Sequence, residues 1–372
     1  MVKGLPLRLS TKVHLDIFLE KMVQIGASDI FVMGDDYVMA HVNSRKVKLT
    51  PRIITNKEVS DMLNDFYGIN ATSQLGSPSP INTDLEFKED LGDGKRPIRH
   101  RFRVNAVNGK RNGRLSVKIT IRAISADPPK ASDLDISKDI LNVCETSQQG
   151  LILVVGGTGN GKSTTLAAIL RHLLEQEESN KHIVTIEEPI EYVYDNIVSP
   201  SSFINQLEKG RCVTSFNQGL ENSLRMAPTD ILIGEARDYD TISTAIEASV
   251  TGHNVYSTVH ANTVAATMQR MISTFPESLQ FQGQQSLIHA LKMVVAQRLV
   301  PSTDGKRVAL REYLIFDKDI QETLSMSKNV TTDTARFVME RGVPMVVDAE
   351  RYYKAGRISE ETLKKIKLNY AS

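Results

Sequence analysis

The sequence contains only two cysteines, Cys144 and Cys212, which are too few for a disulfide framework and lack the paired spacing of a structural zinc site. This usage favours a reducing compartment, so we expect a cytosolic protein. The formal net charge is only +1, from 45 Lys and Arg against 44 Asp and Glu. The chain as a whole therefore has no field that would hold nucleic acid or an anionic membrane, and any basic function must be local.

Long hydrophobic runs are also missing. The longest purely apolar runs reach five residues, as at 151–155, against the roughly 20 that a membrane-spanning helix needs. Near the amino end, Arg8, Lys12, His14 and Asp16 interrupt each apolar stretch, so we expect no export signal. The composition is otherwise ordinary, with 41% hydrophobic and 24% charged residues over 372 positions. At about 150 residues per domain, we expect two or three packed domains.

The first third of the chain has the pattern of a small α+β domain. Helical spacing of apolar residues covers 13–25, and a second helix is expected over 56–67 with Asn56 as its N-cap. Short β-rich runs lie between these helices, and alternation of apolar and polar residues returns from 84 to 124. We therefore predict an N-terminal α+β domain over residues 1–124.

A connector is predicted over residues 125–136, where Pro128 and Pro129 stand among polar neighbours. Beyond it, apolar strands alternate with helical stretches, which is typical of βαβ units and a mainly parallel sheet. We therefore predict a C-terminal α/β domain over residues 137–372 that ends in helices.

A glycine-rich motif, GGTGNGKS, occupies residues 156–163 between an apolar strand and an amphipathic helix. This is the GxxxxGK[ST] pattern, in which glycines let backbone N–H groups turn toward phosphate oxygens at a helix N-terminus. Lys162 is expected to reach the β- and γ-phosphates of ATP, and Ser163 is expected to bind Mg²⁺. The predicted nucleotide-binding residues are Gly156, Gly157, Thr158, Gly159, Asn160, Gly161, Lys162, Ser163 and Thr164.

Hydrolysis also needs carboxylates, which P-loop folds place at the ends of neighbouring strands. One candidate stretch, 182–194, carries Glu187, Glu188 and Glu191 around a proline, although Glu188 is equally well interpreted as a solvated surface residue. In the other, 230–238, an apolar strand ends in Glu235, as in a Walker B motif. A lone acid that closes a buried strand is costly without a partner, which favours a functional role for Glu235.

Two histidines, His253 and His260, stand at the two ends of another strand within residues 251–262. Zinc binding is not favoured, because no Cys or acid lies at ligand spacing nearby. His260 is interpreted either as a buried, hydrogen-bonded core residue or as a polar sensor that couples the γ-phosphate to the next strand.

The stretch 95–122 holds ten Lys and Arg and no acid, with Phe102 as its single aromatic residue. Three interpretations remain open: a nucleic-acid patch, the exposed face of a hairpin, and arginines that stabilise γ-phosphate charge. The scarcity of aromatic residues makes nucleic acid the least favoured of the three.

Four blocks of the sequence together resemble a known family. In chain order, GGTGNGKSTT, IVTIEEPIEYVY, ILIGEARD and TGHNVYSTVHANT resemble the Walker A motif, Asp box, Walker B motif and His box of the secretion ATPase superfamily of type II and type IV systems. RFRVNAVN at 101–108 and QRLV at 297–300 also match. The resemblance implies a hexameric ring ATPase, in which a PAS-like domain precedes a RecA-like P-loop domain and ATP lies between them.

The resemblance also implies roles for individual residues. The family's two catalytic glutamates correspond to Glu191 and Glu235, and which of them acts as general base stays open. His260 lies in the His box. Arg103 and Arg122 are the best candidates for arginine fingers, whereas Arg225 and Arg237 are weaker ones.

Departures from the family pattern narrow the branch. The four-cysteine zinc insertion of extension and export ATPases is missing, so no zinc is expected, and residues 334–342 read TARFVMERG where retraction motors carry an AIRNLIRE-like segment. Gly157 stands where the family usually has Pro or Ala, and Glu188 where it usually has Asp. The chain is most similar to the ATPases of Dot/Icm type IVB secretion, with conjugation ATPases as close relatives.

These resemblances imply an ATPase that uses ATP and Mg²⁺ to power protein translocation. It would be cytoplasmic and recruited to inner-membrane components of a secretion machine. A pilus retraction motor or a conjugation ATPase is the alternative within the family. A nucleotide-gated assembly protein of a membrane complex is the alternative from another class, and a DNA-dependent RecA-type ATPase is a third.

Overall fold

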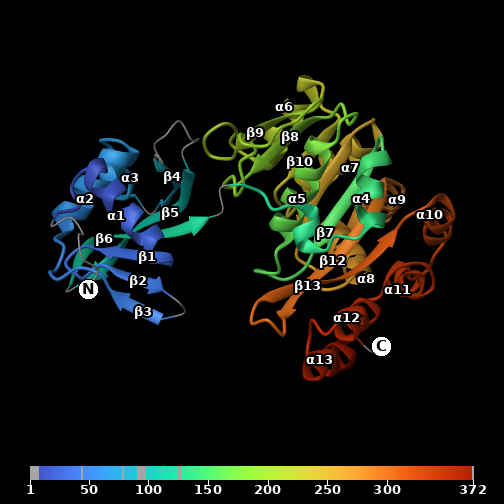
Figure 1. Cartoon of the computed structure of the whole chain (residues 1–372). Coiled ribbons are helices and arrows are strands. Elements are labelled where there is room, and N and C mark those ends of the chain that lie inside the picture. Colours follow the sequence, from blue (N-terminus) through green and yellow to red (C-terminus); the bar gives the residue numbers. More distant parts are fainter. Residues whose placement is uncertain are drawn as a thin grey trace. The chain divides into compact units, whose positions relative to one another are not determined.

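The computed structural model describes residues 8–42, 45–77, 79–89, 98–111, 113–124 and 127–370, and it divides into two compact units, Met1–Ala126 and Asp127–Ser372 (Figure 1). The division lies near the start of the predicted connector. Residues 125 and 126 lie outside the described residues, whereas 127–136 belong to the second unit. There the carbonyl of Pro128 accepts a hydrogen bond from Arg171 at 2.6 Å.

The first unit is built on an antiparallel sheet with the strand order β3-β2-β1-β6-β5-β4. Its strands are β1 (Ala27–Met33), β2 (Met39–Val42), β3 (Arg45–Lys48), β4 (Ile81–Glu89), β5 (Ile98–Arg111) and β6 (Arg114–Ile124). Its helices are α1 (Lys12–Gln24), α2 (Asn56–Tyr67) and α3 (Ala71–Gln74). All three helices contribute to one core with the apolar face of the sheet.

The cap of α2 differs from the prediction. Thr55, not Asn56, is the N-cap, because its hydroxyl accepts the Glu58 N–H while the Glu58 carboxylate accepts the Thr55 N–H, which is a capping box. Asn56 is already helical, and its side-chain oxygen accepts the Val117 N–H at 2.9 Å. The prediction of Asn56 as N-cap was wrong since a tertiary partner claims its side chain.

The second unit holds a sheet with the strand order β13-β12-β7-β11-β10-β8-β9, in which all neighbours are parallel except β12 and β13. Its strands are β7 (Gly150–Val155), β8 (His182–Glu187), β9 (Phe203–Glu208), β10 (Asp230–Ile233), β11 (Asn254–Val259), β12 (Leu291–Pro301) and β13 (Arg307–Ile315). A mainly parallel sheet preceded by an α+β unit confirms the predicted fold class.

Helices cover both faces of this sheet. Along β7, Leu151, Leu153 and Val155 contribute to one core with the helices within residues 216–341, whereas Ile152 and Val154 contribute to another with the helices within 138–175. The helices before the last four are η1 (Ala131–Leu134), α4 (Lys138–Thr146), α5 (Lys162–Glu175), α6 (Phe216–Ser223), η2 (Leu224–Met226), α7 (Tyr239–Val250), α8 (Val264–Ile272), η3 (Glu277–Leu279) and α9 (Gln280–Ala290).

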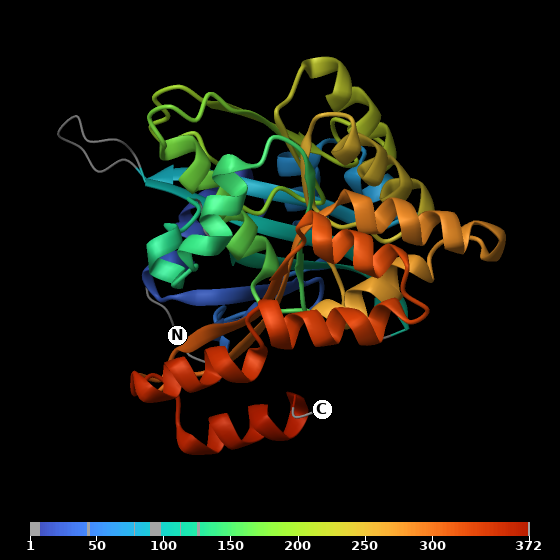
Figure 2. The same cartoon turned by 90° about the vertical axis from the view of Figure 1, so that its right-hand side faces the viewer.

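Four helices follow β13: α10 (Lys318–Ser325), α11 (Val330–Arg341), α12 (Met345–Lys354) and α13 (Glu360–Tyr370). Figure 2 shows the last two, in red, side by side. They form a small core of their own with β12 and β13, in which Met345, Tyr352 and Ile366 pack against Val300 and Leu310. Within the described ranges, no helix combines the length and the apolar character that crossing a membrane requires.

Candidate active site

The predicted functional segments meet at one edge of the second sheet. Because β7, β8, β10 and β11 are parallel, their carboxyl ends lie together, and each is followed by one of the predicted motifs. The glycine loop follows β7, the acidic turn with Glu191 follows β8, Glu235 follows β10 and His260 follows β11. The strand β12 runs past the end of β7, which brings Gln297 beside the glycine loop.

The glycine loop depends on backbone conformations that other residues rarely adopt. Gly156, Gly159 and Gly161 have φ angles of 154°, 77° and 75°. At Gly156 a Cβ atom would also lie only 2.5 Å from the Gln297 carbonyl oxygen. Gly161 is the N-cap of α5, so the helix begins directly at Lys162 and its N-terminus faces the loop.

We expect Gly156→Ala to destabilise the second unit by about 1–3 kcal/mol, because the added methyl group must displace backbone atoms of β12. The measurement is the free energy of unfolding in urea. Gly157→Ala is the matched control, since φ at Gly157 is not positive and its Cβ would meet only the Asn160 amide nitrogen, at 3.2 Å. Equal stability of the two variants would contradict the steric explanation.

Lys162 lies inside the loop. Its ammonium group donates to the carbonyl oxygens of Gly156 and Gly157 at 3.0 and 3.2 Å, and its side chain is buried. Burial lowers the pKa of Lys162, while the negative charges of Glu235 and Glu191 act in the opposite direction. The cation therefore stands among groups that a triphosphate could replace, with both predicted catalytic acids near enough to influence it.

Gln297 on β12 supports the glycine loop through hydrogen bonds, and the sequence pattern assigned no role to this residue. Its Nε2 donates to the Asn160 carbonyl at 2.7 Å, and its Oε1 accepts the Thr165 hydroxyl at 2.7 Å. The Asn160 side chain accepts the Leu299 N–H at 3.2 Å. The QRLV match at 297–300 is the signal that could have found this support.

The first turn of α5 contributes two hydroxyl groups. Ser163 is exposed, whereas the Thr164 hydroxyl lies 3.0 Å from the hydroxyl of Tyr192. This contact links the nucleotide loop to the acidic turn after β8. Tyr192 was not predicted as a site residue.

The three acids at and after the end of β8 have different environments. Burial raises the pKa of Glu187, whose carboxylate accepts hydrogen bonds from Thr185 at 2.7 Å and Gln206 at 3.2 Å. Glu188 is exposed and pairs with Lys209 at 2.8 Å, which fits the surface interpretation. Glu191 is half-buried, and of the two acids beyond the strand it is the one whose charge acts on Lys162.

Glu235 and His260 are brought together by the parallel pairing of β10 and β11. One carboxylate oxygen of Glu235 lies 3.3 Å from His260 Nε2, and the other lies 2.5 Å from Arg237. The Glu235 side chain is 17% exposed and that of His260 is 41% exposed, so His260 is not a buried core residue.

His253 lies at the opposite end of β11, where its ring contacts the Ala248 carbonyl at 3.1 Å. The intervening strand spans about 20 Å at 3.3 Å per residue, so the two histidines cannot bind one metal ion. Arg225 is exposed on η2, and its contact at 3.5 Å is with the Glu221 carbonyl.

The two favoured arginines are direct neighbours in the first unit. Arg122 on β6 pairs in register with Arg103 on β5, and the row continues to Asp29 on β1 and Asp84 on β4. Directly opposed residues share one face of a sheet, so these charges form one row. Burial alone would raise the pKa of Asp29, but the hydrogen bond from Arg122, at 2.6 Å, holds it below its usual value.

Much of the basic stretch is neutralised by acids of other strands and loops. Three further pairs join Arg99 to Glu86 at 2.9 Å, Arg101 to Asp84 at 3.6 Å and Arg111 to Asp36 at 2.7 Å. This pairing reduces the positive charge that phosphate backbones would meet and weakens the nucleic-acid interpretation. Residues 95–97 of the stretch lie outside the described residues.

A cavity of about 630 Å³ adjoins the glycine loop. Its lining includes Gly156, Gly157 and Asn160 of the loop together with Arg298 and Tyr370. The lining includes neither Lys162 nor Ser163, so this cavity lies beside the loop and does not mark the expected position of the phosphates.

Comparison with known proteins decides the family. The model of the Type II/IV secretion system protein family matches residues 101–362, which is well over half of the chain. The chain belongs to this family. The Type IV pilus retraction ATPase PilT of Pseudomonas aeruginosa is 32% identical over 305 residues, covering 82% of this chain and 83% of PilT. The chain is accordingly an ATP-hydrolysing, nucleotide-binding enzyme of the secretion and pilus-retraction ATPases.

Solved structures of this family agree with the fold in detail. The ATPase DotB of Legionella pneumophila has a TM-score of 0.89 at 38% identity, covering 99% of both chains. DotB of Yersinia pseudotuberculosis has a TM-score of 0.82 at 32% identity, covering 98% of this chain and 95% of its own. The pilus retraction motor PilT with bound ADP has a TM-score of 0.80 at 29% identity, covering 94% and 95%. The chain thus has a RecA-like P-loop ATPase unit preceded by a PAS-like α+β unit.

Proposed function

We propose that this protein is a hexameric ATPase that powers protein translocation by a type IV, Dot/Icm-like secretion system. The observation that carries the proposal is the agreement with both DotB structures over nearly the whole chain, at higher identity and TM-score than with the solved PilT structure. Retraction of a pilus is the second candidate, because PilT and PilU of Pseudomonas aeruginosa are each 32% identical to this chain.

In the proposed mechanism, the loop 156–163 holds the triphosphate of ATP with its backbone N–H groups. Lys162 exchanges the carbonyl oxygens of Gly156 and Gly157 for β- and γ-phosphate oxygens. The donor set suits Mg²⁺, because the hydroxyl of Ser163 and the carboxylates near Lys162 are hard oxygen ligands. When bound, Mg²⁺ neutralises charge that develops on the phosphates. Ser163 would hold it.

Glu235 and Glu191 are the proposed carboxylates that order or deprotonate the attacking water. Glu235 contacts both His260 and Arg237, and these contacts restrict the orientation of its carboxylate. His260, with one ring nitrogen on Glu235 and a partly exposed ring, is suited to sense whether the γ-phosphate is present.

Arg103 and Arg122 are the proposed arginine fingers. In a ring, they would stabilise the negative charge on the γ-phosphate, and the planar guanidinium groups suit phosphate oxygens. Arg122 is 61% exposed, and its ion pair with Asp29 is made through Nε. Loss of the γ-phosphate would release these contacts and let the two units move, which converts hydrolysis into mechanical work. The ring would dock on inner-membrane components from the cytoplasm.

Two measurements test the proposal. Imaging of the purified protein with ATP should show six-fold rings, and a different symmetry would contradict the hexamer. In cells, Glu235→Gln should keep docking to the membrane complex while protein export is lost. Export that continues in such cells would instead support a nucleotide-gated assembly protein, and lost pilus retraction with normal export would support the retraction motor.

A further inference from the structure

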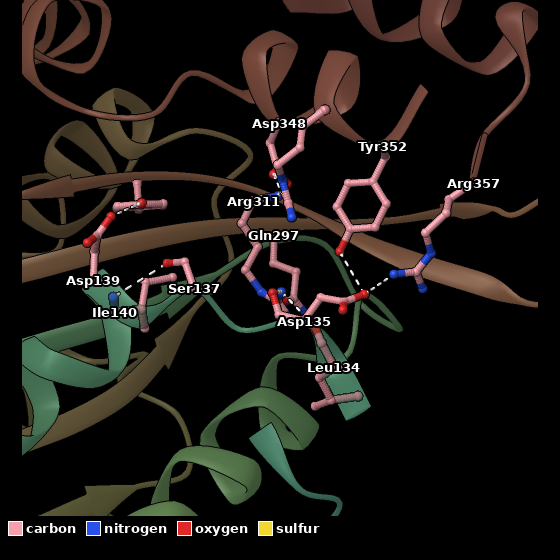
Figure 3. Close-up of polar contacts among 12 residues, drawn as sticks. Leu134, Asp135, Ser137, Asp139, Ile140, Gln297, Arg311, Asp348, Tyr352 and Arg357 are labelled. Atoms are coloured by element: carbon pink, nitrogen blue, oxygen red, sulfur yellow. Dashed lines mark hydrogen bonds and ion pairs between the residues drawn. The ribbon is translucent and has the colours of Figure 1, made fainter. Parts of the chain in front are cut away.

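Arg311, on β13, contacts three separate segments of the second unit, two through its buried guanidinium group and one through its backbone. The residue is only 4% exposed. Its Nε donates to Gln297 Oε1 at 2.9 Å, and one terminal nitrogen donates to the carbonyls of Leu134 and Asp135 at 2.9 and 3.1 Å (Figure 3). Its backbone N–H donates to the Asp348 carboxylate at 2.8 Å. No sequence motif pointed to this residue.

The contact with Gln297 reaches the nucleotide loop. A glutamine amide can be turned over, which exchanges its oxygen and its NH₂ group. The Thr165 hydroxyl accepts either orientation, because a hydroxyl can donate or accept. Arg311 only donates and the Asn160 carbonyl only accepts, so these two groups together fix the amide with its oxygen toward Arg311 and its NH₂ toward the loop.

The other contacts of Arg311 reach the start of the unit through its guanidinium group and the C-terminal helices through its backbone N–H. Leu134 and Asp135 lie at the end of η1, within the segment predicted as a connector. The Asp135 carboxylate is also held by Arg357 and, at 3.4 Å, by the Tyr352 hydroxyl. Asp348 on α12 accepts from Arg351 at 2.9 Å as well as from the Arg311 backbone.

Burial makes these contacts interdependent. Desolvation lowers the pKa of Arg311, and the charges of Asp348 and Asp135 counteract that effect. The second terminal nitrogen has no hydrogen-bond partner among the described residues, so few acceptors remain for a cation that water cannot reach. Loss of any one acceptor would leave the buried charge less solvated. The positions of Arg311 and of its acceptors should therefore depend on one another.

We propose that Arg311 is a positioning residue for the ATP site, which orients Gln297 against the phosphate-binding loop and couples that loop to residues 131–135. If nucleotide orders the loop, it should therefore also order residues 131–135. Because such coupling is reciprocal, a change that orders or disorders 131–135 should alter nucleotide affinity by the same factor. The proposal concerns the residues around the site and does not depend on which transport system the ATPase serves.

The test compares Arg311→Met with Arg311→Lys in the full-length chain, using a fluorescent ATP analogue with Mg²⁺. Met fills similar space without donors, so the dissociation constant should rise about tenfold or more. Lys should restore only part of the affinity, because a point charge cannot span acceptors on three groups. Arg336→Met is the matched control: it removes an arginine on α11 that is 49% exposed and pairs with Asp333, and affinity should change less than about twofold. Unchanged affinity in a folded Arg311→Met protein would overturn the proposal.

A double-mutant cycle separates positioning from general stability. If Arg311 acts through Gln297, adding Arg311→Met to Gln297→Leu should cost almost no further affinity. Additive losses would mean that Arg311 acts elsewhere, which overturns the proposal.

If Arg311→Met fails to fold, amide hydrogen exchange of wild type and Arg311→Lys provides the test instead. Nucleotide should slow exchange at residues 131–135 in wild type and have less effect in Arg311→Lys. Equal protection in both would also overturn it. Failure of the wild-type chain to bind nucleotide would contradict the ATPase itself.

Discussion

Replacing Lys162 by alanine should reduce ATP hydrolysis by about a thousandfold or more. The ammonium group lies inside the glycine loop, within hydrogen-bond distance of two loop carbonyls, where the phosphates of ATP are expected to bind. Without it, negative charge on the phosphates loses its nearest cation both in the bound state and in the transition state. Release of inorganic phosphate by the purified protein is the measurement.

The control for this variant is Lys364→Ala, which removes a lysine that is 74% exposed on α13 and far from the glycine loop in sequence. Both proteins should have the same circular dichroism spectrum, and the control should hydrolyse ATP at the wild-type rate. Activity of folded Lys162→Ala near that rate would place the nucleotide site elsewhere in the chain.

Glu235→Gln should lower kcat by about 10² to 10⁴ while ATP affinity changes little. Glutamine keeps the size of the side chain and one oxygen, which can still accept from Arg237 while its NH₂ group faces His260, but it cannot take a proton from water. The side chain follows β10 at the edge where the glycine loop lies, and its charge already acts on Lys162. Equilibrium binding and single-turnover hydrolysis measure the two effects separately.

Glu191→Gln and Glu188→Gln complete this experiment. Glu188 is an exposed acid paired with Lys209, so its substitution should leave kcat nearly unchanged. If Glu191→Gln has a larger effect on single-turnover hydrolysis than Glu235→Gln, Glu191 is the general base and Glu235 has a supporting role. Wild-type rates in both variants would move the chemistry to other residues.

The local features of the ATP site could be predicted because adjacent residues in the sequence create them. A P-loop is a single continuous segment. GGTGNGKS between a strand and a helix therefore already predicts the glycines with positive φ and the lysine beside them that the structure shows. That the candidate acids meet at one edge of the sheet could be predicted for a related reason. Parallel strands end at one edge, so a residue that directly follows a strand, such as Glu235 or His260, reaches that edge.

The hydrogen-bond and ion-pair partners of individual side chains could not be predicted from such local patterns. Whether Asn56 or Thr55 caps α2 depended on Val117, which lies 61 residues away in sequence. That Glu188 is a surface residue whereas Glu187 is anchored by Thr185 and Gln206 depended on strand β9 lying beside β8.

The sequence by itself determined the enzyme class, because the P-loop, the two acidic motifs and the His box each occupy a short continuous segment whose chemistry is fixed by its own residues. The tertiary structure alone decided what supports that chemistry. Gln297 lies 132 residues from Thr165 in the sequence, and Arg311 lies 177 residues from Leu134. Only the pairing of β12 with β7 and β13 brings these residues together. Hydrogen bonds across such separations leave no periodicity or spacing in a sequence, since any residue with the right donors can serve once the strands are side by side.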